Sequence, residues 1–171
     1  MKNALYVFLI SLLPFIELRG AVPVGAALNL PFYFNYLVSV VGNMLPVPFI
    51  LLFIPYILDF LAGFRLFRPI VEWVRRKADK NRDKIIKDDG DGSAEGFGGE
   101  ARMSRGVFLA LLLFVAIPLP GTGAWTGSLV AALFNLPKRQ SCLAVGLGVM
   151  LCGVIMCLAS YGVLGFLSFL L

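Results

Sequence analysis

Apolar residues fill most of the chain in two long blocks, and one polar segment separates these blocks. The segment from Asp59 to Arg105 holds eleven Lys/Arg and nine Asp/Glu residues. The remaining charged residues are Lys2, Glu17, Arg19, Lys138 and Arg139. Apolar stretches of this length with so few charges are typical of helices that lie in a lipid bilayer. The pattern therefore predicts an all-α integral membrane protein with two membrane blocks and a polar connection.

The two apolar blocks align with each other as copies of one unit. Residues 4–58 match residues 110–164 without a gap, and 16 of the 55 pairs are identical, whereas a leucine-rich composition alone would give roughly five. The identical pairs include residues that break helices. These are Pro14 with Pro120, Asn29-Leu30-Pro31 with Asn135-Leu136-Pro137, and Gly42 with Gly148. An ancestral duplication explains these matches best, and the two asparagines are expected to form turns.

Each half predicts a re-entrant helical hairpin followed by a transmembrane helix. The first apolar run would be about 21 Å long as a helix, which is short of the roughly 30 Å hydrocarbon core. Prolines and glycines after each first run allow the chain to turn back. We therefore expect a first membrane repeat at 1–58 (hairpin 3–31, transmembrane helix 35–58) and a second at 107–171 (hairpin 107–136, transmembrane helix 141–171).

Basic residues predict that the loop at 59–106 faces the cytoplasm, because Lys and Arg resist translocation. One membrane crossing lies between the two hairpins, so they enter from opposite faces as inverted repeats. This predicts a multi-pass protein of the inner (plasma) membrane.

Within the loop, residues 69–87 predict an interfacial amphipathic helix. Its role is either that of a topology anchor, which is favoured, or that of a sensor of anionic lipid. Residues 88–100 hold five acids, five glycines and no basic residue, which predicts a disordered connector.

Glu17 and Arg19 are the main candidates for chemistry, since ionisable residues at membrane depth are costly and usually face an interior cavity. Residues two apart in a helix do not face each other, so the pair converges only where the backbone is unwound, which Gly20 and Pro23 favour. Desolvation is expected to raise the pKa of Glu17, moderated by Arg19, which suits it to carry a proton. Arg19 matches a phosphate or carboxylate, aided by amides of a helix that starts near Ala21. The alternative is that the two charges neutralise each other or cap the frayed backbone.

The second hairpin tip carries no charge, but it supplies backbone amides, two hydroxyls and an indole donor. Its candidate residues are Pro118, Pro120, Gly121, Thr122, Gly123, Trp125, Thr126 and Gly127. Such a tip is suited to complete an anion site opposite Arg19, or its small residues serve close helix packing. Asn43, inside an apolar segment, is a candidate either for lining the same cavity or for an interhelical hydrogen bond.

Residue types that are scarce or absent narrow the classes of function. The net charge of +5 comes without a stacking surface on a soluble domain, so no nucleic-acid partner is expected. The chain has no His and no metal-ligand cluster, and its Ser residues lack a paired base, so we expect no metal, no cofactor and no enzyme activity. The three cysteines are interpreted as buried small hydrophobic residues.

Two strings in the sequence carry a family resemblance: PFIELRGAVPVGAAL at 14–28 and FVAIPLPGTGAWTGSLVAAL at 114–133. They resemble the paired signatures of the small multi-drug export protein family, which is similar to the DedA-like membrane proteins. The resemblance covers both apolar halves but not the loop at 59–106. It implies inverted re-entrant hairpins, transport of phosphate-bearing lipids, and roles for Glu17 and Arg19 in proton coupling and headgroup binding. The second-hairpin arginine usual in DedA proteins is missing here, so a bidentate phosphate clamp does not carry over.

Together these features predict a proton-coupled membrane transporter that moves an amphipathic anionic or lipid-phosphate-like substrate. Rocking of the two inverted repeats would give alternating access. The expected partners are membrane lipids, the substrate and protons, and a homodimer is preferred because polar hairpin tips need cover at the lipid boundary. The alternatives are a non-transporting scaffold or assembly factor and, third, an intramembrane lipid-modifying enzyme.

Overall fold

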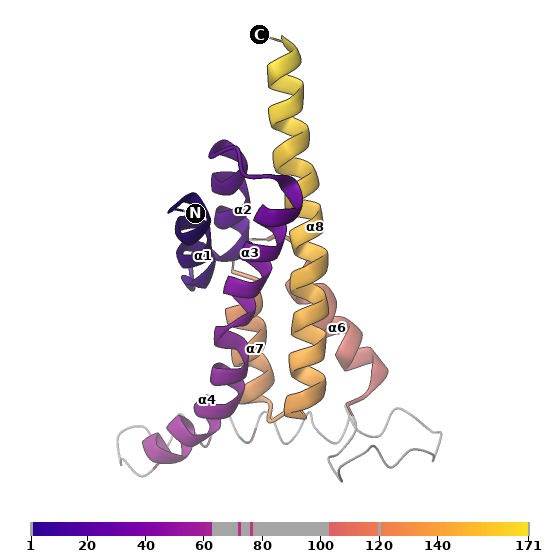
Figure 1. The fold of residues 1–171 in the computed structure, drawn as a ribbon. Coiled ribbons are helices and arrows are strands. Elements are labelled where there is room, and N and C mark those ends of the chain that lie inside the picture. Colours follow the sequence, from indigo (N-terminus) through magenta and orange to yellow (C-terminus); the bar gives the residue numbers. More distant parts are fainter. Residues whose placement is uncertain (1, 63–71, 73–75, 77–102, 120, 171) are drawn as a thin grey trace.

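The structure is a computed structural model that describes residues 2–62, 72, 76, 103–119 and 121–170 (Figure 1). The regular structure in these residues is entirely helical. The helices are α1 (Lys2–Leu12), α2 (Glu17–Ala27), α3 (Phe32–Met44), α4 (Pro46–Ala62), α6 (Arg105–Ala116), α7 (Ala124–Leu133) and α8 (Lys138–Leu170). The prediction of an all-α fold is confirmed for this part of the chain.

Two stretches are long and apolar enough to cross a membrane. The first is Phe32–Ile57, which is made of α3 and most of α4, and the second is Lys138–Gly162 within α8. Both begin three residues before the spans expected at 35–58 and 141–171. The first stretch is interrupted at Leu45, next to Pro46, because a proline ring removes one backbone donor from a helix.

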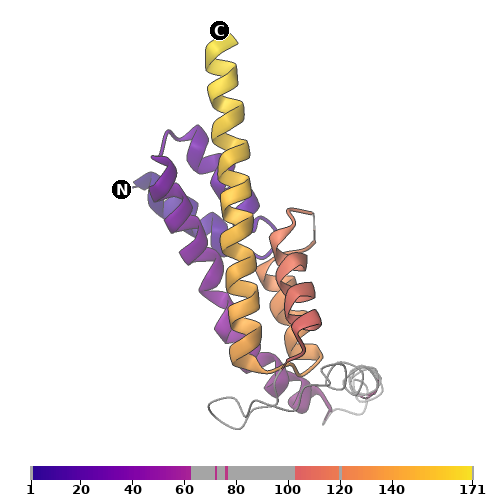
Figure 2. The same cartoon turned by 90° about the vertical axis from the view of Figure 1, so that its right-hand side faces the viewer.

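The shorter helices pair into two hairpins, α1 with α2 and α6 with α7. Figures 1 and 2 show the first hairpin beside the upper part of α8 and the second beside its lower part, with their turns meeting between. Helix α1 packs against α3, and α2 packs against α8. Correspondingly, α6 packs against α8, and α7 packs against α4. Each hairpin thus contacts the long helix of its own half and that of the other half.

The second arms of the two hairpins, α2 and α7, end with the same local motif. Asn29 has a φ of 56° and Asn135 a φ of 52°, in the left-handed region that asparagine tolerates better than most residues. In both halves the amide of the following leucine donates to a carbonyl five residues earlier, at 3.0 and 2.9 Å. This is the Schellman arrangement, and it confirms that both asparagines form turns.

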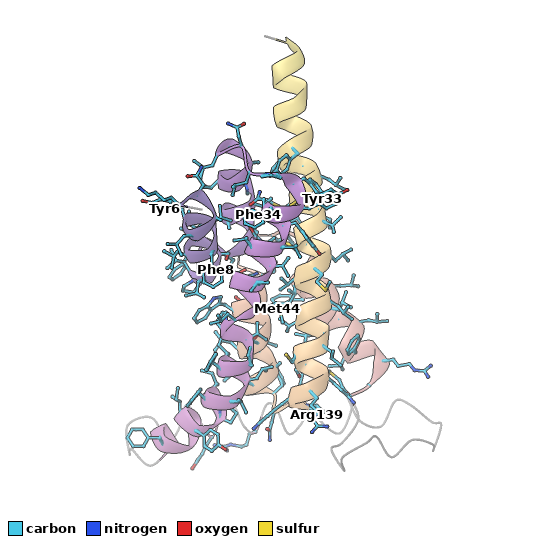
Figure 3. All side chains as sticks on the ribbon, viewed as in Figure 1. Tyr6, Phe8, Tyr33, Phe34, Met44 and Arg139 are labelled. Carbon is cyan, nitrogen blue, oxygen red and sulfur yellow. The ribbon has the colours of Figure 1, made fainter. Side chains whose placement is uncertain are left out.

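Apolar side chains cover the outer surface as well as the core. Leu37, Val41, Leu143 and Leu147 are exposed on α3 and α8, and Figure 3 shows side chains extending outward around these helices. A surface of this kind would drive aggregation in water but is favourable against lipid tails. The buried core lies where α2, α4, α6, α7 and α8 meet.

A buried polar network fixes α2 against α3 and α8. Asn35 is completely buried, and its amide donates to the Val22 carbonyl at 2.9 Å and to the Tyr161 hydroxyl at 3.2 Å. The Tyr161 hydroxyl donates in turn to the Leu30 carbonyl. A β-carbon at Gly25 would lie only 2.0 Å from the Asn35 side-chain oxygen. Because these polar groups are satisfied inside an apolar surrounding, they hold the first hairpin in one position.

Most of the predicted loop lies outside the described residues. This includes the amphipathic helix expected at 69–87, apart from Glu72 and Arg76, and the connector expected at 88–100. Glu72 and Arg76 are helical, and their charged groups are 3.8 Å apart. The cytoplasmic location of the loop stays a prediction.

Two glycines allow the first arms of the hairpins to cross the long helices closely. A β-carbon at Gly42 would lie 2.9 Å from the Phe8 carbonyl oxygen, and one at Gly148 would lie 2.8 Å from both the Leu112 carbonyl oxygen and the Val115 β-carbon. These contacts are with backbone or branched atoms, which cannot rotate away. Both crossings therefore require glycine.

We predict that Gly148→Ala lowers the thermal midpoint of the purified protein in detergent, because the added methyl group overpacks the crossing of α6 and α8 by about 1–3 kcal/mol. Gly162→Ala is the matched control on the same helix, since a β-carbon there meets nothing within 4 Å. The control should leave the midpoint unchanged or raise it, because alanine favours helix. Equal midpoints for the two variants would contradict the close crossing.

Candidate functional site

The turn of the first hairpin is shorter than expected. Helix α2 starts at Glu17, and not near Ala21 as predicted. Gly20 and Pro23 lie inside α2, so the unwinding expected around them is confined to residues 13–16. Glu17 itself has a φ of 50°, in the left-handed region, which costs a non-glycine residue about 1–3 kcal/mol. This conformation at the first helical residue lets Glu17 and Arg19 extend in the same direction although they are two positions apart.

The Glu17 carboxylate lies at the N-terminus of α7, in the opposite hairpin. Glu17 is only 6% exposed, and one carboxylate oxygen accepts a hydrogen bond from the Trp125 backbone amide at 3.2 Å. The amide of Ala124 faces the same carboxylate. The other oxygen sits over Gly123, where a β-carbon would lie 1.8 Å away. Glu17 therefore serves as an N-cap supplied by another segment, where the helix dipole favours a negative charge.

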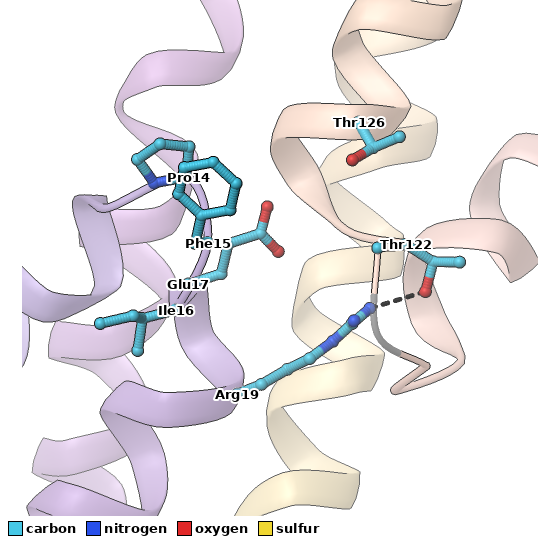
Figure 4. A pocket seen from close by; sticks show the side chains of 8 residues that line it. Pro14, Phe15, Ile16, Glu17, Arg19, Thr122 and Thr126 are labelled. Carbon is cyan, nitrogen blue, oxygen red and sulfur yellow. Dashed lines mark hydrogen bonds between the residues drawn. The ribbon is translucent and has the colours of Figure 1, made fainter.

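Arg19 also reaches the second hairpin. Its Nη2 atom donates to the Thr122 hydroxyl oxygen at 2.7 Å (Figure 4). The same atom donates to the Ile117 carbonyl at 3.3 Å. Glu17 and Arg19, both in the described part of the chain, form no ion pair with each other within 4.0 Å. Each charged group binds the opposite tip instead, although the charge of Arg19 still acts on the Glu17 carboxylate. The alternative that the two charges neutralise each other or cap the frayed backbone stays a prediction.

An open pocket of about 560 Å³ lies between the two tips. Its lining residues are Pro14, Phe15, Ile16, Glu17, Arg19, Gly121, Thr122 and Thr126. Figure 4 shows the Glu17 and Arg19 side chains extending from the first hairpin toward the second, with the two threonines opposite. Phe15 is 98% exposed beside them. The pocket therefore combines a cation, an acid and hydroxyls with apolar side chains, which is a chemistry suited to an amphipathic anion.

The other predicted residues of the second tip have different surroundings. The Trp125 indole donates to the Leu12 carbonyl at 3.3 Å, so it closes the end of α1 and is not free for an anion. A β-carbon at Gly127 would lie 2.6 Å from a side chain of α6, which agrees with the close-packing alternative. Pro118 is exposed in the turn, and Pro120 lies outside the described residues.

Asn43 lies with Glu17 and Arg19 around a second, small cavity of about 10 Å³. It is 3% exposed, and its side-chain oxygen has no hydrogen-bond partner among the described residues. The interhelical hydrogen bond that was the alternative role is thus not made by this oxygen. Cys152 lines the same cavity and its thiol faces Arg19. Sequence reasoning missed Cys152 because a cysteine in an apolar helix carries no signal of such a role.

Among the described residues, no group of three or more His, Cys, Asp or Glu side chains could hold a metal ion. The role of each candidate residue in the two tips stays a prediction. The geometry brings together Glu17, Arg19, Thr122 and Gly123, with Thr126 on the pocket wall.

The fold and the site define a helical membrane protein in which two charged residues lie where two short hairpins meet. Residues 17–155 match the family described as "putative small multi-drug export protein", and the chain therefore belongs to this family. The match begins at Glu17, directly after the turn of the first hairpin, and includes the whole turn of the second hairpin. None of the curated proteins and none of the solved structures matches the chain. The family and the membrane class are confirmed, and the likeness to DedA-like proteins stays a prediction.

The close approach of the Glu17 carboxylate to Gly123 allows a test of the contact between the tips. Gly123 has extended backbone angles that alanine adopts freely, so Gly123→Ala harms the protein only through the clash with the carboxylate. We predict that it destabilises the wild-type protein by about 0.5–2 kcal/mol, because the carboxylate must move away and lose its hydrogen bond to the Trp125 amide. In a Glu17→Ala background the same change should be neutral or stabilise by about 0.4–1 kcal/mol, because it reduces the freedom of the unfolded chain.

The measurement is the thermal midpoint in detergent of the wild-type protein, both single variants and the double variant. A loss of stability from Gly123→Ala that is equally large with and without the Glu17 carboxylate would rule out this contact.

Proposed function

We propose that the protein is a transporter that moves an amphipathic anion, such as a lipid phosphate, across the bilayer, and that Glu17 exchanges a proton during the cycle. The observation that carries the proposal is the open pocket of about 560 Å³ to which both Glu17 and Arg19 contribute. A buried acid beside a fixed cation in a membrane protein is costly and is usually kept for function. Membership of a family named for small multi-drug export supports transport as the activity.

The two hairpins are re-entrant and inverted in this proposal. Helices α1, α2, α6 and α7 have 10 to 12 residues each, so each is roughly 15–18 Å long and too short to cross the hydrocarbon core alone. The hairpins approach from opposite ends of the long helices. Tyr33 and Phe34 lie near one end and Arg139 near the other (Figure 3), which fits an aromatic outer interface and a basic cytoplasmic side.

Contacts between equivalent residues of the two halves support the inverted repeat. A two-fold axis brings residues near it into contact with their own counterparts. Glu17 contacts Gly123, which is 106 positions later. The small cavity is lined by this pair and by two further pairs with the same spacing, Leu18 with Ala124 and Asn43 with Val149. An axis between the tips accounts for all three pairs, and rocking about it would open the pocket alternately to the two sides.

Arg19 is suited to bind the anionic group of the substrate. Within the described part of the chain, both hydrogen bonds of its guanidinium are made by Nη2, which leaves the two donors of Nη1 for a phosphate or carboxylate. Thr122 fixes the guanidinium plane, and Thr126 adds a hydroxyl to the pocket wall. The exposed side chain of Phe15 gives the apolar part of the substrate a contact beside the charged group.

Glu17 links the proton to movement of the tips. Its ionised carboxylate holds the N-terminus of α7 through the Trp125 amide. A protonated carboxyl carries no charge for the helix dipole to attract, so the contact between the two tips weakens when Glu17 takes up a proton. Proton exchange then accompanies the change between conformations.

Transport in vesicles tests the role of Glu17. In the experiment the reconstituted protein receives fluorescent lysophosphatidic acid, and a membrane-impermeant quencher reports the leaflet in which the probe lies. We predict flux that depends on a pH gradient and falls at least tenfold in Glu17→Gln, which keeps the side-chain shape. Glu72→Gln is the control because it removes an acid of the loop outside the pocket. Wild-type flux in Glu17→Gln would overturn the proton role.

Arg19 is tested in the same vesicles by the concentration dependence of the flux. Arg19→Lys keeps the charge but loses the planar fork, and Arg19→Ala loses both. A hydrogen bond to a charged group contributes about 1.5–3 kcal/mol, so we expect half-saturation to rise by about 10–100-fold in Arg19→Ala and less in Arg19→Lys. A neutral fluorescent monoacylglycerol should not be moved by any variant. Unchanged half-saturation in Arg19→Ala would remove the anion site.

A static scaffold is the second candidate function. It is favoured by the hydrogen bonds that both charged residues make to the opposite hairpin. Glu17 and Arg19 each bind the opposite hairpin, and a purely structural clamp needs nothing more. The two functions differ in the vesicle experiment. A scaffold gives no flux in the wild-type protein, while the same substitutions lower its thermal midpoint.

A further inference from the structure

The small cavity of about 10 Å³ is separate from the open pocket in its lining, although both include Glu17 and Arg19. Helices α2, α3, α6, α7 and α8 contribute to it, and every lining residue except Arg19 is buried. The cavity therefore adjoins the Glu17 carboxylate inside the protein.

Two buried polar atoms of the residues that line this cavity have no hydrogen-bond partner in the described part of the chain. They are the side-chain oxygen of Asn43 and Nε of Arg19. The first is an acceptor and the second is a donor. Only 3% of the Asn43 surface is exposed. Bulk water therefore cannot reach its side-chain oxygen. A buried polar atom without a partner is costly, and native proteins satisfy nearly all such atoms.

The size and the chemistry of the cavity select its occupant. Its volume of about 10 Å³ is at the lower limit of what one water molecule needs, about 10–15 Å³. A larger anion does not fit, and the guanidinium of Arg19 repels a sodium ion. A water molecule in the cavity would accept from Arg19 Nε and donate to Asn43 and to Glu17. It would then have three polar partners, the usual number for a buried water.

We propose that this cavity binds one water molecule and that Asn43, through this water, positions the proton on Glu17. When Glu17 is ionised, the water donates to its carboxylate and to Asn43. When Glu17 is protonated, its O–H donates to the water, which still donates to Asn43. Asn43 is thus a positioning residue for both protonation states. The inference deepens the proposed function, on which the meaning of this proton depends.

Few ionisable groups face Glu17 in this cavity. Arg19 comes from its own helix, and the Cys152 thiol comes from α8. The cavity is also lined by Asn43 of α3, Val115 of α6, Ala124 of α7 and Gly123 directly before α7, whose side chains do not titrate. Substitution of Asn43 therefore adds or removes no charge near Glu17. A change in the titration midpoint of Glu17 then reports a change in the hydrogen bonds of the cavity.

Infrared difference spectroscopy of the full-length protein in lipid vesicles tests the proposal. The carboxylic-acid band of Glu17 is identified by its loss in Glu17→Gln and is followed against pH in wild-type and Asn43 variants. Asn43→Leu is similar in size and removes the acceptor and hence the water. The ionised carboxylate loses a charge-assisted hydrogen bond, which is stronger than the one lost by the neutral acid. We predict that the titration midpoint rises by roughly 1 pH unit.

Two variants control for a structural effect. Asn43→Ser keeps an acceptor and leaves room for water, so its midpoint should stay close to the wild-type value. Ser39→Ala removes a buried hydroxyl of α3 that bonds Asn35 and does not line the cavity, and its midpoint should not change. An unchanged midpoint in Asn43→Leu, or an equal rise in Ser39→Ala, overturns the proposal. A midpoint that responds to replacing potassium by sodium overturns it as well, because the occupant is then a cation.

This readout does not depend on transport. If the vesicles show no flux but the Asn43→Leu midpoint rises, the proposed function fails and the water site stands. If flux depends on Glu17 and the midpoint does not move, the transporter stands and the role of Asn43 fails.

Discussion

The way in which the two hairpin tips meet depends on the contact between the Glu17 carboxylate and the N-terminus of α7. A carboxylate that is 6% exposed needs strong compensation inside an apolar protein. The first-turn amides of α7 supply it, and Gly123 provides the space for close approach. This contact joins two segments that are about a hundred residues apart in the chain, and Arg19 adds a second link through Thr122. An interaction of this kind is sensitive to a single proton, because only the ionised acid benefits from the helix dipole.

The two hairpins are held in different ways at their outer ends and at their tips. Apolar packing, glycine crossings and the buried Asn35 network fix each hairpin against the long helices. None of these contacts is made by an ionised side chain. The tips instead meet through one acid, one base and a small polar cavity. Movement is therefore expected at the tips, where the contacts respond to protons and anions, while the outer parts keep their packing.

Much of the fold follows from the sequence, because helix breakers and charges are rare in it and their positions carry information. The all-α class, the two long apolar helices and the asparagine turns were correctly predicted. Glu17 and Arg19 stood out as the charged residues of the first tip, and the structure brings them to Thr122 and Gly123 of the second. The details of the turn were not predictable. Gly20 and Pro23 favour a break, but tertiary packing keeps both inside α2, and the strain falls on Glu17 instead.

The partner of Glu17 could not be deduced from residue types, because it is a backbone amide and any residue supplies one. The close contact of the carboxylate with Gly123 and the cavity beside Asn43 could not be deduced either, because both depend on how the two halves meet.

The most direct test of the proposed mechanism is a structure determined by electron cryo-microscopy in lipid with lysophosphatidic acid. The account predicts density for the phosphate beside Arg19 Nη1, facing Thr126, in the pocket between the tips. Phosphate density bound elsewhere, with this pocket closed by protein side chains, would contradict it.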